Sequence, residues 1–230
     1  MKTYAERTYD SKNFLVRFAH RKRFNNSLKS INFSETKRIL DYGCGDGKFL
    51  NSLFEITKGK EIYLVGFEPV QIIKNNVNFT IYNDLNEIKK IAGNKKFNII
   101  TCFEVLEHFN EKKQTEILEQ IYTLLQKDGQ LIISVPIETG IPALIKNVFR
   151  KFNYPKAENY KFKNIFKSFL GLPLEEFRKS DTYLSHTGFD YRKLEHLLKK
   201  QFILVNKKFS PVNIFGRVIN SQVFFTLKKI

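Results

Sequence analysis

Short apolar segments alternate with helical patterns along most of this 230-residue chain, and this alternation restricts the fold more than any other feature. The segments expected to be strands are residues 38–42, 62–67, 78–82, 97–103 and 131–135. The helices expected to follow them are residues 48–56, 70–77, 85–92 and 111–126, the last closed by Asp128 and Gly129. Because the strand segments are continuously apolar, they predict a parallel sheet that is buried on both faces.

A further helix over 190–200 and two strands over 202–209 and 222–227 complete the pattern. The whole predicts an α/β fold with a doubly wound, mostly parallel seven-stranded sheet of the Rossmann-like type. We expect one domain spanning 1–230. Its expected parts are an N-terminal helical cap (1–35), a ligand-binding core (36–138), an insertion (139–185), and the last helix with two strands (186–230). Long insertions in compact domains are often functional lids, so we expect a helical lid there.

Charge is distributed unevenly along the chain. The net charge is +16, yet residues 39–138 are mildly acidic and everything that flanks them is basic. The flanks either face an anionic partner, such as a phosphate, a nucleotide-linked sugar, a nucleic acid or a membrane surface, or form a solvated lysine-rich surface. The chain has two cysteines, no run of about 18 apolar residues and no secretory signal, which favours the cytoplasm.

A glycine-rich turn follows the first strand at residues 41–47, with the spacing GxGxG. The dinucleotide fingerprint GxGxxG would need its third glycine at Lys48, so a nicotinamide-dependent oxidoreductase is disfavoured. Glu68 ends the second strand, 21 residues after Gly47. A carboxylate at about that distance can accept hydrogen bonds from ribose hydroxyls, which indicates a nucleoside site. The alternative for Glu68 is a surface carboxylate at a strand end.

Four segments in this order resemble the motifs of class I S-adenosylmethionine-dependent methyltransferases. They are RILDYGCGDGKFL (38–50), YLVGFEPV (63–70), FNIITCFEVLEHF (97–109) and DGQLIISVP (128–136). The resemblance covers about residues 36–138, and the third segment is similar to the branch that includes the ubiquinone-biosynthesis methyltransferases. HTGFDYRKLEHLL (186–198) looks like a segment of methyltransferases encoded with surface-polysaccharide pathways.

The resemblance implies S-adenosyl-L-methionine as cofactor and assigns its contacts. Gly43, Cys44 and Gly45 would lie along the methionyl part, Asp41 would meet its ammonium, and Glu68 with Pro69 would take the ribose. The adenine would meet Asp84 and Leu85, and the methionyl side would be lined by Cys102 and Phe103. Asp84 has an alternative role as the N-cap of the helix that begins at Leu85. Arg17, His20 and Arg21 would close over the cofactor or form a solvated basic face.

Methyl transfer needs in-line alignment and, for a hydroxyl acceptor, a general base. The candidates are His108, Glu104 and His186. His108 could instead pack beneath the site, and Glu104 and Glu107 could instead serve as favourable charges at a helix start. His196 is expected to be exposed. The sequence shows no cluster of metal ligands, so we expect no metal.

The leading functional hypothesis is O-methylation of a small anionic molecule or a sugar or glycan precursor, bound by the 139–185 insertion. The alternatives are an N-methyltransferase or a quinone- or lipid-precursor methyltransferase on the same fold, and a non-catalytic binding scaffold. Nucleic acid is disfavoured because the strand-four motif lacks the Asn/Asp-Pro-Pro-aromatic sequence. Peripheral membrane contact stays open, and nothing in the chain indicates an oligomeric state.

Overall fold

The computed structural model describes residues 28, 31, 33, 35–70, 77–153, 156–172, 174, 177, 180–183, 185–212 and 214–230. The predicted N-terminal helix over 11–30 lies outside these residues except for Leu28, and with it lie Arg17, His20 and Arg21. The predicted helix over 70–77 is described only at its two ends.

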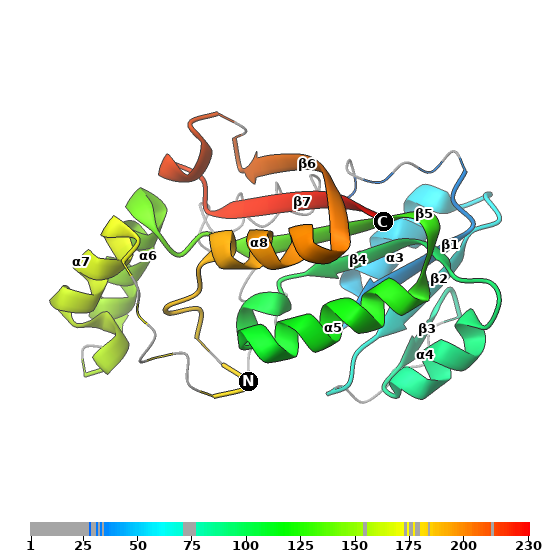
Figure 1. Cartoon of the computed structure of the whole chain (residues 1–230), viewed down its shortest axis with the longest axis horizontal. Coiled ribbons are helices and arrows are strands. Elements are labelled where there is room, and N and C mark those ends of the chain that lie inside the picture. Colours follow the sequence, from blue (N-terminus) through cyan, green and yellow to red (C-terminus); the bar gives the residue numbers. More distant parts are fainter. Residues whose placement is uncertain are drawn as a thin grey trace.

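A seven-stranded sheet organises the described part of the chain (Figure 1). Its strands are β1 (Arg38–Tyr42), β2 (Tyr63–Phe67), β3 (Thr80–Tyr82), β4 (Phe97–Phe103), β5 (Leu125–Pro136), β6 (Phe202–Ser210) and β7 (Gln222–Lys229). They lie in the order β3-β2-β1-β4-β5-β7-β6. The five strands from β3 to β5 are parallel, and β7 runs antiparallel to both β5 and β6. The predicted α/β class and mostly parallel seven-stranded sheet are confirmed.

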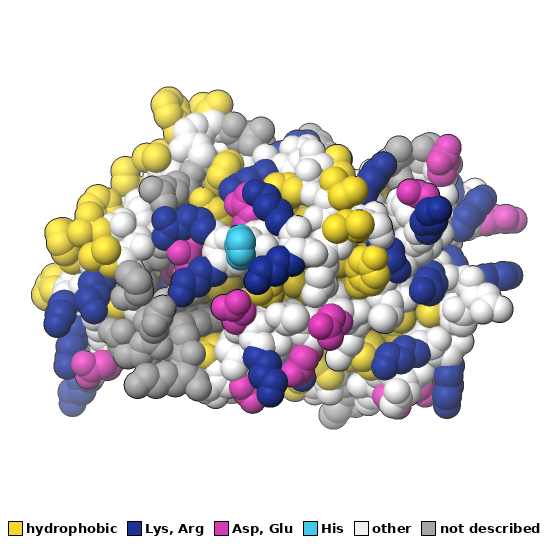
Figure 2. All heavy atoms as spheres, viewed as in Figure 1, with side chains coloured by type: hydrophobic (Ala, Val, Ile, Leu, Met, Phe, Trp, Pro, Cys, Tyr) yellow, Lys and Arg dark blue, Asp and Glu magenta, His cyan; other side chains and the backbone are white. Residues whose placement is uncertain are grey.

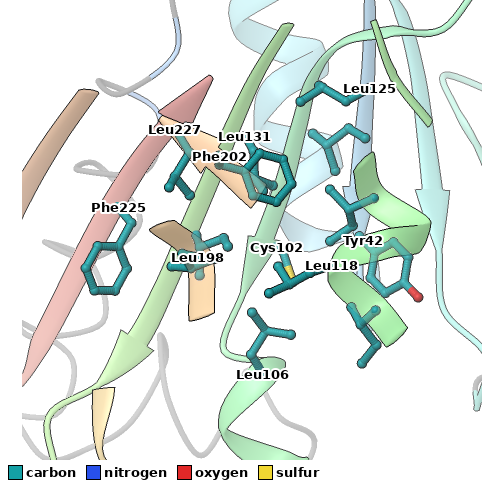
Figure 3. Close-up of a cluster of buried hydrophobic side chains, with 14 of the residues drawn as sticks. Tyr42, Cys102, Leu106, Leu118, Leu125, Leu131, Leu198, Phe202, Phe225 and Leu227 are labelled. Atoms are coloured by element: carbon teal, nitrogen blue, oxygen red, sulfur yellow. The ribbon is translucent and has the colours of Figure 1, made fainter. Parts of the chain in front are cut away.

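Helices cover the sheet on both faces, as a doubly wound fold requires. They are α3 (Lys48–Thr57), α4 (Leu85–Ala92), α5 (Glu111–Leu124), α6 (Gly140–Asn153), α7 (Phe162–Leu170) and α8 (Tyr191–Gln201). Successive residues of β1 supply opposite faces, because Ile39 packs with α3 whereas Leu40 packs in the larger cluster under α4, α5 and α8. Figure 3 shows part of that larger cluster, where Leu118 of α5 and Leu198 of α8 lie among strand residues such as Leu131 and Phe202.

The strand order reverses at β1, because β2 and β3 extend to one side of it and β4 and β5 to the other. In such sheets, ligands bind at the carboxyl ends of the strands beside this switch point. The loops that follow β1, β2 and β4 therefore carry the candidate site. No helix in the described ranges is long and apolar enough to cross a membrane.

The predicted boundary between the helix over 111–126 and the strand over 131–135 is wrong. The helix α5 ends at Leu124, and β5 begins at once with Leu125, so Asp128 and Gly129 lie inside the strand rather than at the helix end. The pairing explains this, because Phe97 lies opposite Leu125 whereas Ile99 lies opposite Gln130, which leaves the intervening residues as a bulge. Asp128 takes a left-handed φ of 64° there.

Candidate active site

The turn after β1 folds back over the end of β2. The backbone N–H groups of Gly43 and Cys44 both donate to the carbonyl of Phe67, at 2.8 and 3.1 Å. Gly43 has a φ of 80°, and a Cβ at this position would lie 2.3 Å from a methyl group of Val105. Only glycine satisfies both the left-handed backbone and this close approach.

Gly45 occupies the middle of the turn. Its φ of 54° is left-handed, and a Cβ built on it meets no atom of the described residues within 4 Å. Packing against the described part of the chain therefore does not require glycine here. Open space above a left-handed glycine is what a ligand lying on the backbone requires, and S-adenosylmethionine is such a ligand.

Glu68 closes the other side of the turn. Its Oε2 accepts from the N–H of Gly45 at 3.0 Å, and its Oε1 accepts from the N–H of Val70 at 3.2 Å. The side chain thus leans toward the glycine turn and remains partly exposed. A carboxylate offers about four acceptor positions, so two remain for ribose hydroxyls.

Asp41 lies beneath the turn with 3 % of its surface exposed, and its Oδ1 accepts from the Thr101 hydroxyl at 2.7 Å. Burial raises the pKa of Asp41 to about 7; the Thr101 hydrogen bond opposes this rise and the nearby Glu68 charge adds to it. A cation above the turn, such as an α-ammonium group, would stabilise the ionised form.

The remaining predicted cofactor residues differ in accessibility. Asp84 is exposed and caps α4, accepting from the N–H of Asn86 at 2.8 Å, and Leu85 is half-buried behind it. Pro69 is exposed. Cys102 is fully buried, and Figure 3 shows its side chain among core residues, so a ligand contact there would use its backbone. Phe103 is half-buried and packs edge-on against Phe49.

Glu104, directly after β4, has a left-handed φ of 57°, which costs energy for a residue with a side chain. Its Oε1 accepts from the Ser134 hydroxyl at 3.2 Å and from Gln222 Nε2 at 2.5 Å. The side chain therefore connects the ends of β4, β5 and β7. This arrangement suits a positioning role better than proton transfer.

His108 and His186 come together although they are far apart in the sequence. His108 ends the short helix η1 (Leu106–His108), and His186 lies in the loop before α8; their ring centroids are 5.0 Å apart. His108 Nδ1 lies 2.8 Å from the carbonyl oxygen of Tyr183. Because a carbonyl can only accept, Nδ1 carries the hydrogen, and Nε2 of the neutral ring keeps its lone pair.

Two buried carboxylates flank this histidine pair. Glu107 is fully buried, and its Oε1 lies 4.0 Å from His108 Nε2 and 3.8 Å from His186 Nε2. Glu138 Oε1 lies 3.6 Å from His186 Nδ1. The interpretation of Glu107 as a helix-start charge does not account for this position, and Glu138 was not among the candidates. Both carboxylates reach the site through tertiary packing.

Glu138 is held by two cations, Lys146 at 2.7 Å and Arg150 at 3.0 Å, both from α6. Burial alone would raise the pKa of Glu138, but Lys146, His186 and Arg150 together hold it well below its usual range. The donor atoms of Glu107, His108 and His186 lie within 4.8 Å of one another, a group that could hold a metal ion. The sequence offered no sign of this group because His186 lies far along the chain from the adjacent pair Glu107 and His108.

Two surface grooves lie elsewhere. One of about 520 Å³ lies between α4 and α5. The other, of about 450 Å³, lies at the amino ends of the strands and is lined by residues that include Lys37, Lys95 and Lys127. Neither groove contains a predicted site residue. The site is therefore defined by the strand-end residues.

The glycine turn, the Glu68 carboxylate and the strand order define a nucleoside-binding fold of the class I methyltransferase type. A family model described as a methyltransferase domain matches residues 12–168, more than half of the chain. The chain belongs to this family, which confirms the predicted class I S-adenosylmethionine-dependent methyltransferase with S-adenosylmethionine as its cofactor.

Similar proteins of known name share part of the chain. A ubiquinone biosynthesis O-methyltransferase of Haemophilus ducreyi is 27% identical over 124 residues, which cover 49% of this chain and 50% of that protein. A tRNA U34 carboxymethyltransferase of Helicobacter hepaticus is 30% identical over 118 residues, covering 45% and 36%. The chain thus matches half or less of these relatives' length.

A crystal structure of magnesium protoporphyrin IX methyltransferase from Synechocystis, with bound S-adenosylhomocysteine, superposes with a TM-score of 0.57. It is 13% identical, and the match covers 98% of this chain and 92% of that one. At this identity the similarity concerns the fold.

Proposed function

We propose that this protein transfers a methyl group from S-adenosylmethionine to a hydroxyl group of a small anionic acceptor, of the sugar or glycan-precursor class. The observation that carries the proposal is the histidine pair after the carboxyl end of β4, flanked by two buried carboxylates. A hydroxyl acceptor benefits from a general base in a way that an already neutral amine does not.

When bound, S-adenosylmethionine supplies a methyl group that its sulfonium already activates. We propose that Gly43, Cys44 and Gly45 support its methionyl part, Asp41 its ammonium, and Glu68 with Pro69 its ribose. Asp84, Leu85, Cys102 and Phe103 complete the proposed contacts, Cys102 through its backbone. The chain's main task is to align the acceptor oxygen with the methyl carbon.

We assign the general base to His108. The Tyr183 carbonyl accepts from its Nδ1–H, so Nε2 is the nitrogen that would take the hydroxyl proton as the oxygen–carbon bond forms. Glu107 Oε1, 4.0 Å from that Nε2, would stabilise the imidazolium that results. His186, between Glu107 and Glu138, would orient the acceptor, and Glu104 would position the loop after β4. A metal is not needed for this sequence of steps.

We propose that the 139–185 insertion forms the acceptor site, because Glu138 connects this insertion to β5. The basic side chains of the insertion would meet phosphate or carboxylate groups of the acceptor. The proposed location is the cytoplasm, where the two buried thiols of Cys44 and Cys102 stay reduced. Hydroxylated quinone precursors are the second acceptor class to test, because a relative named as a ubiquinone biosynthesis O-methyltransferase matches the core.

The test is a methyl-transfer screen with labelled S-adenosylmethionine against sugar phosphates, nucleotide sugars, hydroxylated quinone precursors, amines and a tRNA pool. We expect label in a hydroxyl acceptor, unchanged by a metal chelator. His108→Gln should lower kcat by about 10²- to 10⁴-fold with little change in cofactor binding. His196→Gln, exposed on α8, is the control. Label only in amines or tRNA, or full activity of His108→Gln, would refute the proposal; cofactor binding without any transfer would favour a scaffold.

A further inference from the structure

One end of the molecule displays large apolar side chains to solvent. On α6 these include Phe149 and Phe152, on α7 Phe162 and Phe166, and in the β6–β7 loop Ile214 and Phe215; each is at least 60 % exposed. The three segments adjoin, because α6 contacts both α7 and the short helix η4 (Gly216–Val218) of that loop. Figure 2 shows the apolar side chains along this end, where Figure 1 places α6 and α7. We call this surface the apolar end.

Both helices bury some of their polar residues. Asn147 of α6 and Ser168 of α7 are buried and hydrogen-bonded to each other at 3.3 Å, and the Ser168 hydroxyl donates to the Glu138 carbonyl at 2.7 Å. Asn164 is also buried and donates to the Glu158 carbonyl at 3.0 Å. A helix pair folded only for water would bury its phenylalanines and expose these amides. The arrangement therefore suits an apolar environment outside the molecule.

The buried side chain of Asn220 stabilises the loop between β6 and β7. Asn220 is fully buried; its Oδ1 accepts from the N–H of Val212 at 2.9 Å, and its Nδ2 donates to the carbonyls of Ile214 and Gly216 at 2.9 and 2.7 Å. These bonds fix the backbone so that Ile214 and Phe215 point outward, 61 % and 72 % exposed. The loop thus presents apolar side chains on an ordered support.

The charges around the apolar end are mostly positive. Between residues 140 and 172 the sequence has seven basic residues and one acidic residue, Glu158. Lys146 and Arg150 bind the buried Glu138, and Lys161 binds Glu158. Lys151, Lys156, Lys163 and Lys167 add to the positive charge of this segment, and Figure 2 shows Lys and Arg side chains beside the apolar ones. Two copies of such a surface would repel each other, whereas an anionic surface would attract it.

We propose that the apolar end docks on an anionic lipid bilayer. Its phenylalanines enter the boundary between headgroups and acyl chains, and its lysines face the lipid phosphates. Because α6 begins only a few residues after β5 ends, docking brings the carboxyl end of β5 close to the lipid surface. His186 and Glu138 lie at this end. The proposal rests on the surface alone and does not depend on the proposed acceptor.

The test is flotation of the full chain with vesicles of phosphatidylcholine, with and without about 30% phosphatidylglycerol. We expect binding to the anionic vesicles only, weakened at about 0.5 M salt. The triple variant Phe152→Gln, Phe162→Gln and Phe215→Gln should lower the binding constant at least roughly tenfold. Because the three rings are 72–80 % exposed, the variant should keep the wild-type melting temperature.

The matched control is Ile203→Gln with Val205→Gln, on the edge strand β6, where the side chains are 55 % and 53 % exposed. This control should bind vesicles like the wild type. Absence of wild-type binding to anionic vesicles, or equal binding by the triple variant, would overturn the proposal. So would concentration-dependent dimerisation that the triple variant abolishes without any vesicle binding, since the apolar end would then join two copies.

Discussion

Asp41 supplies a prediction whose size follows from its burial. The pKa of this carboxyl is raised to about 7 from 3.8, first by desolvation. Between these two pH values the folded protein binds more protons than the unfolded chain, so the free energy of unfolding falls as pH rises through this window. The difference between the two pKa values corresponds to a loss of about 4 kcal/mol in the free energy of unfolding. This loss is complete above pH 7 and absent below pH 3.8.

Asp41→Asn removes that cost, because an amide oxygen can still accept from the Thr101 hydroxyl and does not ionise. Relative to the wild type, the variant should gain up to about 4 kcal/mol between pH 4 and pH 8, less a constant cost for burying the amide N–H group. Urea unfolding across this range measures the difference, with Asp46→Asn, exposed on the same turn, as the control.

A constant difference between Asp41→Asn and the wild type at every pH would refute this reasoning. The same variant should bind S-adenosylhomocysteine more weakly, because an amide cannot neutralise the α-ammonium group. Greater stability with weaker binding is the result expected when a buried charge is kept for a ligand.

Three further predictions address other parts of the molecule. Gly45→Ala should still fold, at a cost of about 1–2 kcal/mol for its left-handed φ, but should lose cofactor binding. Gly43→Ala should lose more stability, because its Cβ would meet Val105. Thermal unfolding measures the stability of each variant, and calorimetry measures its cofactor binding. Glu138→Gln should lower the free energy of unfolding at pH 7 by about 3 kcal/mol, since Lys146 and Arg150 lose their partner. The pKa of Glu138 is lowered, so its stabilising contribution is present above pH 4.5 and lost as pH falls toward the folded-state pKa; unfolding at several pH values should show the variant's deficit shrinking in acid. Asn220→Ala should detach the β6–β7 loop and speed its proteolysis near Phe215 while the sheet keeps its amide-exchange protection.

The parts of the structure that depend on local sequence were predictable. β1, β4 and α4 have the predicted bounds, because continuous apolar runs and the Asp84 cap mark their ends within a few residues. The glycine turn and the position of Glu68 followed from spacing along two adjacent strands. The end of α5 did not, since the pairing of Phe97 with Leu125 overrides the turn propensity of Asp128 and Gly129.

The catalytic region was predictable only in part. His108 and His186 were separate candidates, but their contact depends on how the loop before α8 crosses the end of β4. Glu107 and Glu138 look like surface carboxylates in the sequence, and only packing buries them beside the histidines. Polar residues that meet across loops leave no periodic signal, whereas residues of one strand do.

Calorimetric titration with S-adenosylhomocysteine tests the central claim most directly. The account predicts micromolar binding by the wild type, roughly −7 to −9 kcal/mol, that Glu68→Ala abolishes and Glu119→Ala, exposed on α5, leaves unchanged. Glu68→Gln, which can still accept from the N–H of Gly45, should bind with intermediate affinity. No binding by the wild type, or equal binding by Glu68→Ala, would contradict the account.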